Sequence, residues 1–167
     1  MSAPLELESN PRQPLVSGLL SLPHSVPGAV SRYEAEVVLD SGRTWRVSWD
    51  TRTRLAHVFD EKGEPQGWTE RTEKRIRQVV LPGGVRPPVW MEDTLFSRVV
   101  WLEETCYKAV MMLEGRKRVF GNDRLRLEHR DFTSEVRFRC APELLVAGII
   151  VAFEVYGAGN CQSSAGG

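Results

Sequence analysis

The feature that most constrains this fold is an uninterrupted apolar segment near the C-terminus. Residues 144–153 carry no polar side chain. Pro142 and Glu143 precede the segment and Gly157 follows it. Proline and an acidic residue suit the first turn of a helix, and glycine commonly ends one. A half-exposed helix is apolar on one face only, so a segment that is apolar all round predicts a helix covered on every side.

Two other structures remain open for this segment. Several of its residues are β-branched, and periodicity alone does not separate a buried strand from a buried helix in a short run. A transmembrane span needs about 20 apolar residues, whereas runs of roughly 10–14 are typical of buried core helices. The length, the Pro-Glu start and the closing glycine favour a buried helix over residues 142–156.

The rest of the chain divides by composition. Residues 1–31 contain five prolines with serine and glycine between them, which predicts an irregular N-terminal arm. Within it, residues 15–20 have an alternative role as a docked edge strand or hydrophobic latch. Residues 32–157 form the predicted domain, which is long enough to bury a core without disulfides or metal. Residues 158–167 are a Gly/Ser-rich tail.

Short alternating segments between residues 33 and 140 predict antiparallel strands. Residues 33–39 and 44–49 flank an Asp-Ser-Gly-Arg turn and predict a hairpin. Residues 70–78 are ambiguous: their charges suit a solvated helix, whereas residues 76–81 have the pattern of a strand. Further strands are expected at residues 54–59, 66–69, 95–102, 107–113, 118–120, 124–129 and 133–140. The expected fold is mainly β: an antiparallel β-barrel enclosing or packed on a hydrophobic C-terminal α-helix.

This order of strands and terminal helix resembles the tubby C-terminal-like superfamily, which includes tubby-like, LURP-one-related and phospholipid scramblase proteins. The likeness lies in residues 132–139 (Phe-Thr-Ser-Glu-Val-Arg-Phe-Arg) and 144–156, and as a pattern it extends over residues 33–157. It implies a twelve-stranded barrel around the helix. For the tubby-like members, it also implies phosphoinositide binding through basic residues on the barrel. The calcium segment and cysteine-rich cluster of scramblases are not visible here, nor is the ending typical of tubby proteins.

Three arginine pairs at spacing two lie on three successive predicted strands. They are Arg116 and Arg118, Arg124 and Arg126, and Arg137 and Arg139, with Lys117 beside the first pair. Spacing two places each pair on one face of a strand, and apolar residues between the arginines of the later pairs predict that these arginines face outward. Arginine binds phosphate in a planar, bidentate manner, so the pattern predicts an anion-binding patch. The alternative is cross-strand pairing with Glu114, Glu128 and Glu135, together with ordinary solubility.

No catalytic or metal-binding motif emerges from the sequence. His24, His57 and His129 have no cysteine or carboxylate nearby at ligand spacing. Residues 115–121 lack the spacing of a phosphate-binding loop, and no serine lies in a Gly-x-Ser-x-Gly motif. The acidic residues Asp93, Glu103 and Glu104 are expected in exposed loops. We therefore expect no metal, no cofactor and no enzymatic activity.

Aromatic residues are the other candidates for ligand contacts. Trp45, Val47 and Trp49 share one face of a predicted strand by the period-two rule. Tryptophan can stack on bases or sugars, but large aromatic side chains dominate protein cores. We expect this face to line the barrel interior.

Charge and cysteine content limit the classes of function that fit the chain. Basic and acidic residues are equal at 22 each, so the net charge does not favour nucleic acid as a partner. Three widely spaced cysteines and no signal peptide predict an intracellular, cytoplasmic protein. The leading hypothesis is a non-enzymatic binding module, peripheral to a membrane, that recognises anionic lipid such as phosphoinositide, or a phosphorylated partner. The alternatives are a structural or assembly subunit that binds protein partners, and a lipocalin-like carrier or enzyme with an open interior.

Overall fold

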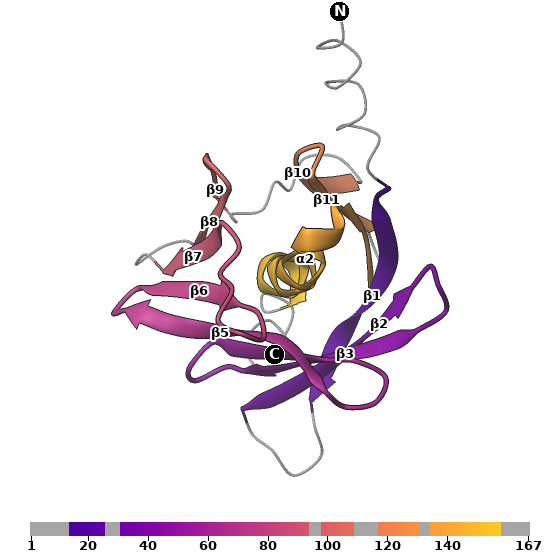
Figure 1. Cartoon of the computed structure of the whole chain (residues 1–167), viewed down its shortest axis with the longest axis horizontal. Coiled ribbons are helices and arrows are strands. Elements are labelled where there is room, and N and C mark those ends of the chain that lie inside the picture. The colour runs from indigo at the N-terminus through magenta and orange to yellow at the C-terminus, as the bar shows by residue number, and fades with distance from the viewer. Residues whose placement is uncertain (1–13, 26–30, 94–97, 109–116, 131–133, 158–167) are drawn as a thin grey trace, which may run out of the picture.

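The computed structural model describes residues 14–25, 31–93, 98–108, 117–130 and 134–157. Within these ranges, twelve antiparallel strands form one sheet and a helical segment follows them (Figure 1). The strands are β1 (Val16–Ser25), β2 (Arg32–Leu39), β3 (Thr44–Asp50), β4 (Leu55–Phe59), β5 (Pro65–Glu73), β6 (Ile76–Val80), β7 (Val89–Asp93), β8 (Arg98–Leu102), β9 (Thr105–Lys108), β10 (Lys117–Gly121), β11 (Leu125–Arg130) and β12 (Glu135–Cys140). The prediction of a mainly β fold is confirmed.

The sheet curls around the helix but does not close into a barrel. Its order is β10-β11-β12-β1-β2-β3-β4-β5-β6-β7-β8-β9, so β10 and β9 are its two edges. Closure would require hydrogen bonds between these two edge strands, and the described residues of β9 and β10 do not pair with each other. The prediction of a closed barrel is therefore wrong, because short alternating strands specify antiparallel pairing but not the joining of the last two edges.

The predicted C-terminal helix is confirmed, with three parts in succession. A 3₁₀ turn spans Pro142–Leu144, α2 spans Leu145–Ala152, and a π-helical turn spans Phe153–Gly157. Residues 146–152 are all buried. Figure 1 shows α2 inside the curve of the sheet, with strands around it in this view. The segment is apolar all round because the concave face of the sheet covers it.

Side chains on the concave face pack directly on the helix. Trp45, Val47 and Trp49 of β3 are buried, as predicted from their period-two spacing. The ring of Trp49 lies 5.2 Å from that of Phe153, centroid to centroid. At Gly148 an added Cβ would lie 2.8 Å from Leu125 Cδ1, so glycine at this position allows the helix to approach β11 closely.

Strand β1 lies within the segment for which composition predicts an irregular arm. It is an internal strand, paired with β12 on one side and β2 on the other, so the docked alternative at residues 15–20 takes the form of a central strand and not of an edge. Leu20 and Leu22 are buried, and a Cβ added at Gly18 would lie 2.5 Å from the ring of Phe138. Residues 1–13, 26–30 and 158–167 lie outside the described residues.

The segment that the sequence leaves ambiguous, residues 70–78, belongs to a hairpin. Strand β5 continues to Glu73 and β6 begins at Ile76. Along β6 the burial alternates, and Arg77 and Val79 are both fully buried. The charged residues that suggest a solvated helix include one that faces the core.

Candidate anion-binding face

Strands β11 and β12 hold three arginines of the predicted patch. Leu125 and Leu127 of β11 are fully buried, as are Val136 and Phe138 of β12, so the residues between them face outward. Three of these outward residues are exposed: Arg126, Arg137 and Arg139. We call these three residues the arginine face. The expected outward orientation is observed for them because their neighbours pack against α2.

The register of β11 and β12 sets the charge pattern of the arginine face. Arg126 lies directly opposite Arg139, and Glu128 lies directly opposite Arg137. Like charges at directly opposed positions destabilise a sheet, whereas opposite charges stabilise it. Arg126 has one weak contact, 4.0 Å from its Nη2 to Glu128 Oε2. Within the described part of the chain, no carboxylate lies within ion-pair distance of Arg139.

The next two strands add apolar side chains to the same outer surface. Leu19 of β1 lies opposite Arg137, and Val38 of β2 lies opposite Leu19. Leu19 is partly exposed, and Val38 is 39% exposed. Together with Glu128 on the other side of Arg137, they form an outer row of one acidic, one basic and two aliphatic side chains.

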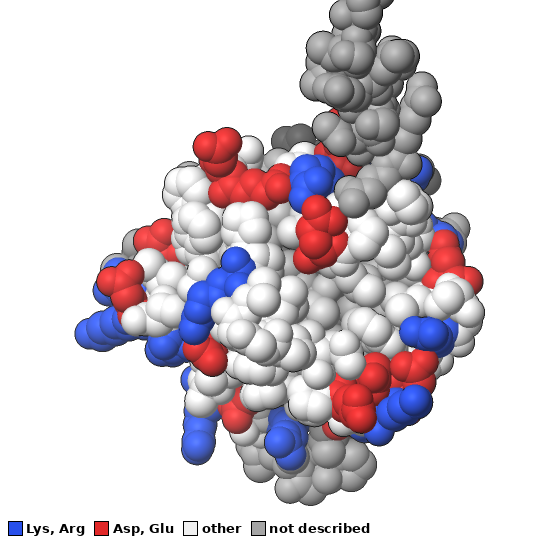
Figure 2. Space-filling view, viewed as in Figure 1, with Lys and Arg blue, Asp and Glu red and all other residues white. Residues whose placement is uncertain are grey.

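Arg124 has a different role from the one predicted. Its Nε lies 2.7 Å from Glu103 Oε2, and its Nη2 lies 3.0 Å from Glu143 Oε2. Glu103 lies in the β8–β9 turn and Arg124 next to β11, so this ion pair joins the two open ends of the sheet. Figure 2 shows a basic side chain near the top of the view, at the place of β10 and β11 in Figure 1, with acidic side chains to its left and below it.

These contacts also shift the pKa values of Arg124 and Glu143. The hydrogen bond to Glu143, followed by that to Glu103, raises the pKa of Arg124 above its ordinary value despite partial desolvation. A hydrogen bond from its own backbone N–H, and then one from Arg124, lower the pKa of the Glu143 carboxyl. The charge of Arg124 is thus compensated by two carboxylates, which leaves it poorly suited to bind an external anion.

The remaining predicted residues lie on or before β10. Arg116 lies outside the described residues. The register pairs Lys117 with Arg130 and Arg118 with His129. His129 is buried, and its ring stacks on Tyr156 at 5.2 Å. The side chains of Lys117 and Arg118 lie outside the described residues, and in backbone register it is Gly121 of β10 that lies opposite Arg126.

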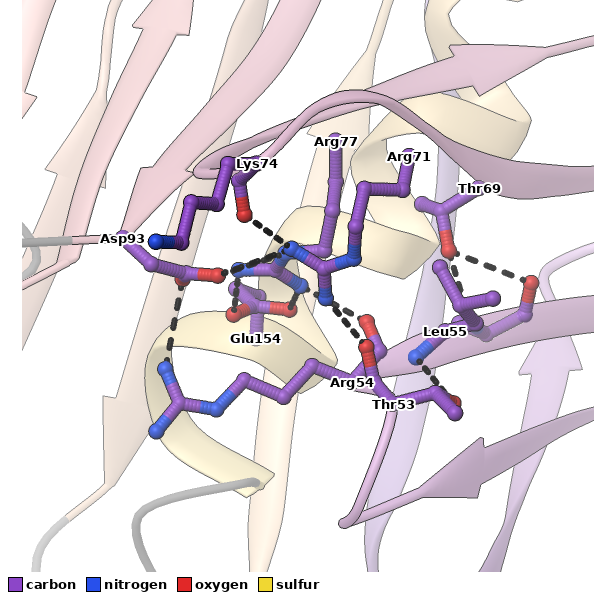
Figure 3. Close-up of polar contacts among 10 residues, drawn as sticks. Thr53, Arg54, Leu55, Thr69, Arg71, Lys74, Arg77, Asp93 and Glu154 are labelled. Atoms are coloured by element: carbon purple, nitrogen blue, oxygen red, sulfur yellow. Dashed lines mark hydrogen bonds and ion pairs between the residues drawn. The ribbon is translucent and has the colours of Figure 1, made fainter.

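Sequence reasoning did not find the buried ionic cluster around Arg77. The Arg77 guanidinium is fully buried and donates two hydrogen bonds to the equally buried Glu154, at 2.9 and 2.8 Å. It donates two more to Asp93, at 3.2 and 2.6 Å, and one to the backbone oxygen of Arg54 at 2.8 Å. Figure 3 shows Arg77 between the two carboxylates, with Arg54 and Arg71 nearby.

This cluster attaches the end of the helical segment to the sheet. Glu154 belongs to the π-helical turn, Arg77 to β6 and Asp93 to the end of β7. Burial alone lowers the pKa of the Arg77 guanidinium, but the charges of Glu154 and Asp93 outweigh it and raise the pKa above its ordinary value. Asp93, expected in an exposed loop, is therefore a structural partner. In the sequence, the signal for this cluster is Glu154, because a carboxylate at the end of a buried apolar segment needs a cationic partner in the core.

The other candidates for chemistry do not assemble into a site. Within the described ranges, no group of three or more His, Cys, Asp or Glu side chains is placed to hold a metal ion. The helices found there are too short or too polar to cross a membrane. Comparison of the chain with protein-family models, curated proteins and solved structures gives no match.

Proposed function

We propose that this chain is a non-enzymatic binding module that docks on membranes containing phosphorylated lipid headgroups, through the arginine face. The observation that carries the proposal is the cross-strand opposition of Arg126 and Arg139. A like-charged pair costs stability, and a bound phosphate between the two guanidiniums would convert this repulsion into two charge-assisted contacts.

The surroundings of the pair favour a membrane over a soluble anion. Leu19 and Val38 continue the row of Arg137 across β1 and β2, so shallow insertion of aliphatic side chains would accompany the electrostatic contact. Lys and Arg near an anionic leaflet each contribute about 1 kcal/mol, and buried apolar area adds to that. Three arginines and two aliphatic residues fit weak, reversible and salt-sensitive attachment.

The layout supports the same proposal. Twelve antiparallel strands and an apolar terminal helix are the arrangement that the tubby-like resemblance implies, although the sheet here is open. The proposal places the chain with those lipid-binding domains in function as well as in layout. A lipocalin-like carrier is less consistent with this structure, because α2 occupies the position that a ligand would take inside the sheet.

Co-sedimentation with vesicles tests the proposal. The purified protein is incubated with vesicles of neutral lipid, of phosphatidylserine and of phosphoinositide, at 50 and 500 mM salt. We expect binding to phosphoinositide vesicles that falls steeply with salt, since surface electrostatics is screened over about 10 Å at 0.1 M salt and over shorter distances at higher salt. Equal binding to all three compositions, or no binding to any, would reject the recognition of phosphorylated headgroups.

A second candidate function follows from the open edges of the sheet. Strands β9 and β10 each have a neighbour on one side only among the described strands, and such edges can pair with a strand from another protein. An assembly subunit of this kind would form a complex that survives high salt. Size-exclusion chromatography with light scattering at 500 mM salt tests for such self-association, and a pull-down in the same salt tests for other protein partners.

A further inference from the structure

A second polar site lies on the outer surface, on strands β2, β3 and β4. A solvent-open hollow of about 390 Å³ is lined by Arg32, Glu34, Arg46, Val47, Ser48, His57 and Phe59. We call it the β3 groove. The hollow arises from a difference in side-chain size. Ser48 on the central strand lies in register between Glu34 and His57, so a small residue is flanked by two larger ones.

Both arginines of the β3 groove lie opposite carboxylates without pairing with them. Arg32 is in register with Asp50, whose Oδ1 instead accepts hydrogen bonds from the backbone N–H groups of Arg52 and Thr53. Arg46 is in register with Glu36. Within the described part of the chain, no carboxylate lies within ion-pair distance of Arg32 or Arg46. Their charges therefore remain available to a ligand.

Aromatic contacts orient the far side of the groove. The guanidinium carbon of Arg46 lies 5.9 Å from the centre of the Phe59 ring, and the ring of His57 stacks on that of Phe59 at 6.3 Å. A planar guanidinium supported by an aromatic face is preorganised for bidentate contact with a phosphate. The imidazole of His57 and the hydroxyl of Ser48 add hydrogen-bonding groups beside it.

We infer that the β3 groove binds a phosphate monoester that also carries hydroxyl groups. Arg32, Arg46 and His57 would bind the phosphate, and Glu34 would accept a hydrogen bond from a ligand hydroxyl. This site is separate from the arginine face and does not depend on the membrane proposal; its phosphate would come from a soluble ester or from a lipid headgroup.

Titration with glycerol 3-phosphate, followed by NMR of the His57 imidazole and the Arg46 guanidinium, tests the inference. We expect saturable shifts in the millimolar range at constant ionic strength, and no shifts with glycerol alone. Arg46→Ala should weaken binding at least tenfold and Arg46→Lys by less, because lysine keeps the charge but lacks the planar fork. Arg43→Ala, which removes an exposed arginine outside the groove, should bind as the wild type does.

A vesicle arm distinguishes the two sources of phosphate. If glycerol 3-phosphate does not bind but Arg46→Ala weakens binding to phosphoinositide vesicles, the inference holds with a lipid headgroup as ligand. If neither probe depends on Arg32 or Arg46, the inference is wrong, whatever Arg139→Glu does to vesicle binding. Loss of vesicle binding in Arg139→Glu with normal glycerol 3-phosphate titration would show that the two sites are independent.

Discussion

Arg77 shows how much of this structure depends on one buried charge. Removing two ions from water costs several kcal/mol for each, and only good geometry offsets that cost. Bidentate contact with Glu154 and two bonds to Asp93 supply such geometry. The sequence did not predict it, because residues 70–78 have the charge content of a solvated surface and no local pattern shows that position 77 faces inward. Trp45 and Trp49 were predictable because their strand alternates regularly.

Replacing Arg77 with methionine should destabilise the protein by about 3–5 kcal/mol, since Glu154 would keep its charge in the core without its bidentate partner. Urea unfolding followed by fluorescence measures the change. The double variant Arg77→Met/Glu154→Leu should recover much of the loss, because it leaves fewer buried charges uncompensated. A loss below about 1 kcal/mol in the single variant would contradict the role given to the cluster.

Cys140 is fully buried at the end of β12. Burial raises the pKa of its thiol from 9.0 to about 12. Between these values the unfolded chain has released the proton and the native state keeps it, so stability falls as pH rises, by at most about 1.4 kcal/mol per pH unit. Well below pH 9 the thiol is protonated in both states and adds no pH dependence.

Urea unfolding of the wild type and of Cys140→Ala at pH 8, 9 and 10 isolates this contribution from those of other groups. The stability advantage of the wild type over Cys140→Ala should shrink as pH rises. A difference that stays constant across the three pH values would show that Cys140 ionises equally in both states.

Composition and periodicity do not determine whether the sheet closes, and this is the main property of the strands that they leave open. The terminal helix was predictable from its ends and its uniform apolar character, and the antiparallel pairing from the turns. Whether β9 and β10 join depends on contacts between strands that the local pattern does not encode. Across the described edges, the ion pair of Glu103 and Arg124 takes the place of backbone hydrogen bonds, and Glu143 connects it to the start of the helix.

Replacing Arg124 with alanine should therefore loosen the edges more than it destabilises the whole. We expect a loss of global stability below about 1 kcal/mol, as is usual for partly exposed ion pairs. Hydrogen exchange measured by mass spectrometry should accelerate in β9 and β10 and stay unchanged in β3. Arg126→Ala is the matched control on the neighbouring strand, since its ion pair does not span the edges. Equal exchange in both variants would contradict this account.

At the scale of the whole molecule, the concave face of the sheet stabilises the fold, whereas part of the convex face carries like charges that destabilise it. The core positions of β11 and β12 fill the space around α2, while the outward positions bring two arginines into opposition. The sequence predicted that these arginines share a face, but not that Arg124 forms ion pairs with Glu103 and Glu143. Spacing two identifies the face of a strand and not the partner across it.

If opposed arginines are kept for binding, removing the repulsion should stabilise the fold. Arg139→Glu creates an opposite-charge pair with Arg126, and we expect a gain of about 0.2–1 kcal/mol in unfolding free energy. Urea unfolding at low salt measures it, and the gain should diminish at 500 mM salt. A loss of stability would mean that Arg139 has a structural partner.

The most direct test of the central claim compares vesicle binding by two variants with the same change in net charge. Arg126→Glu/Arg139→Glu reverses two of the three charges of the arginine face and keeps a like-charged pair, so its stability should remain near that of the wild type. Arg43→Glu/Lys62→Glu reverses two exposed charges elsewhere. The account predicts that the first variant binds phosphoinositide vesicles at least tenfold more weakly and the second binds within about twofold of the wild type. Equal weakening in both variants, or none in the first, would contradict it.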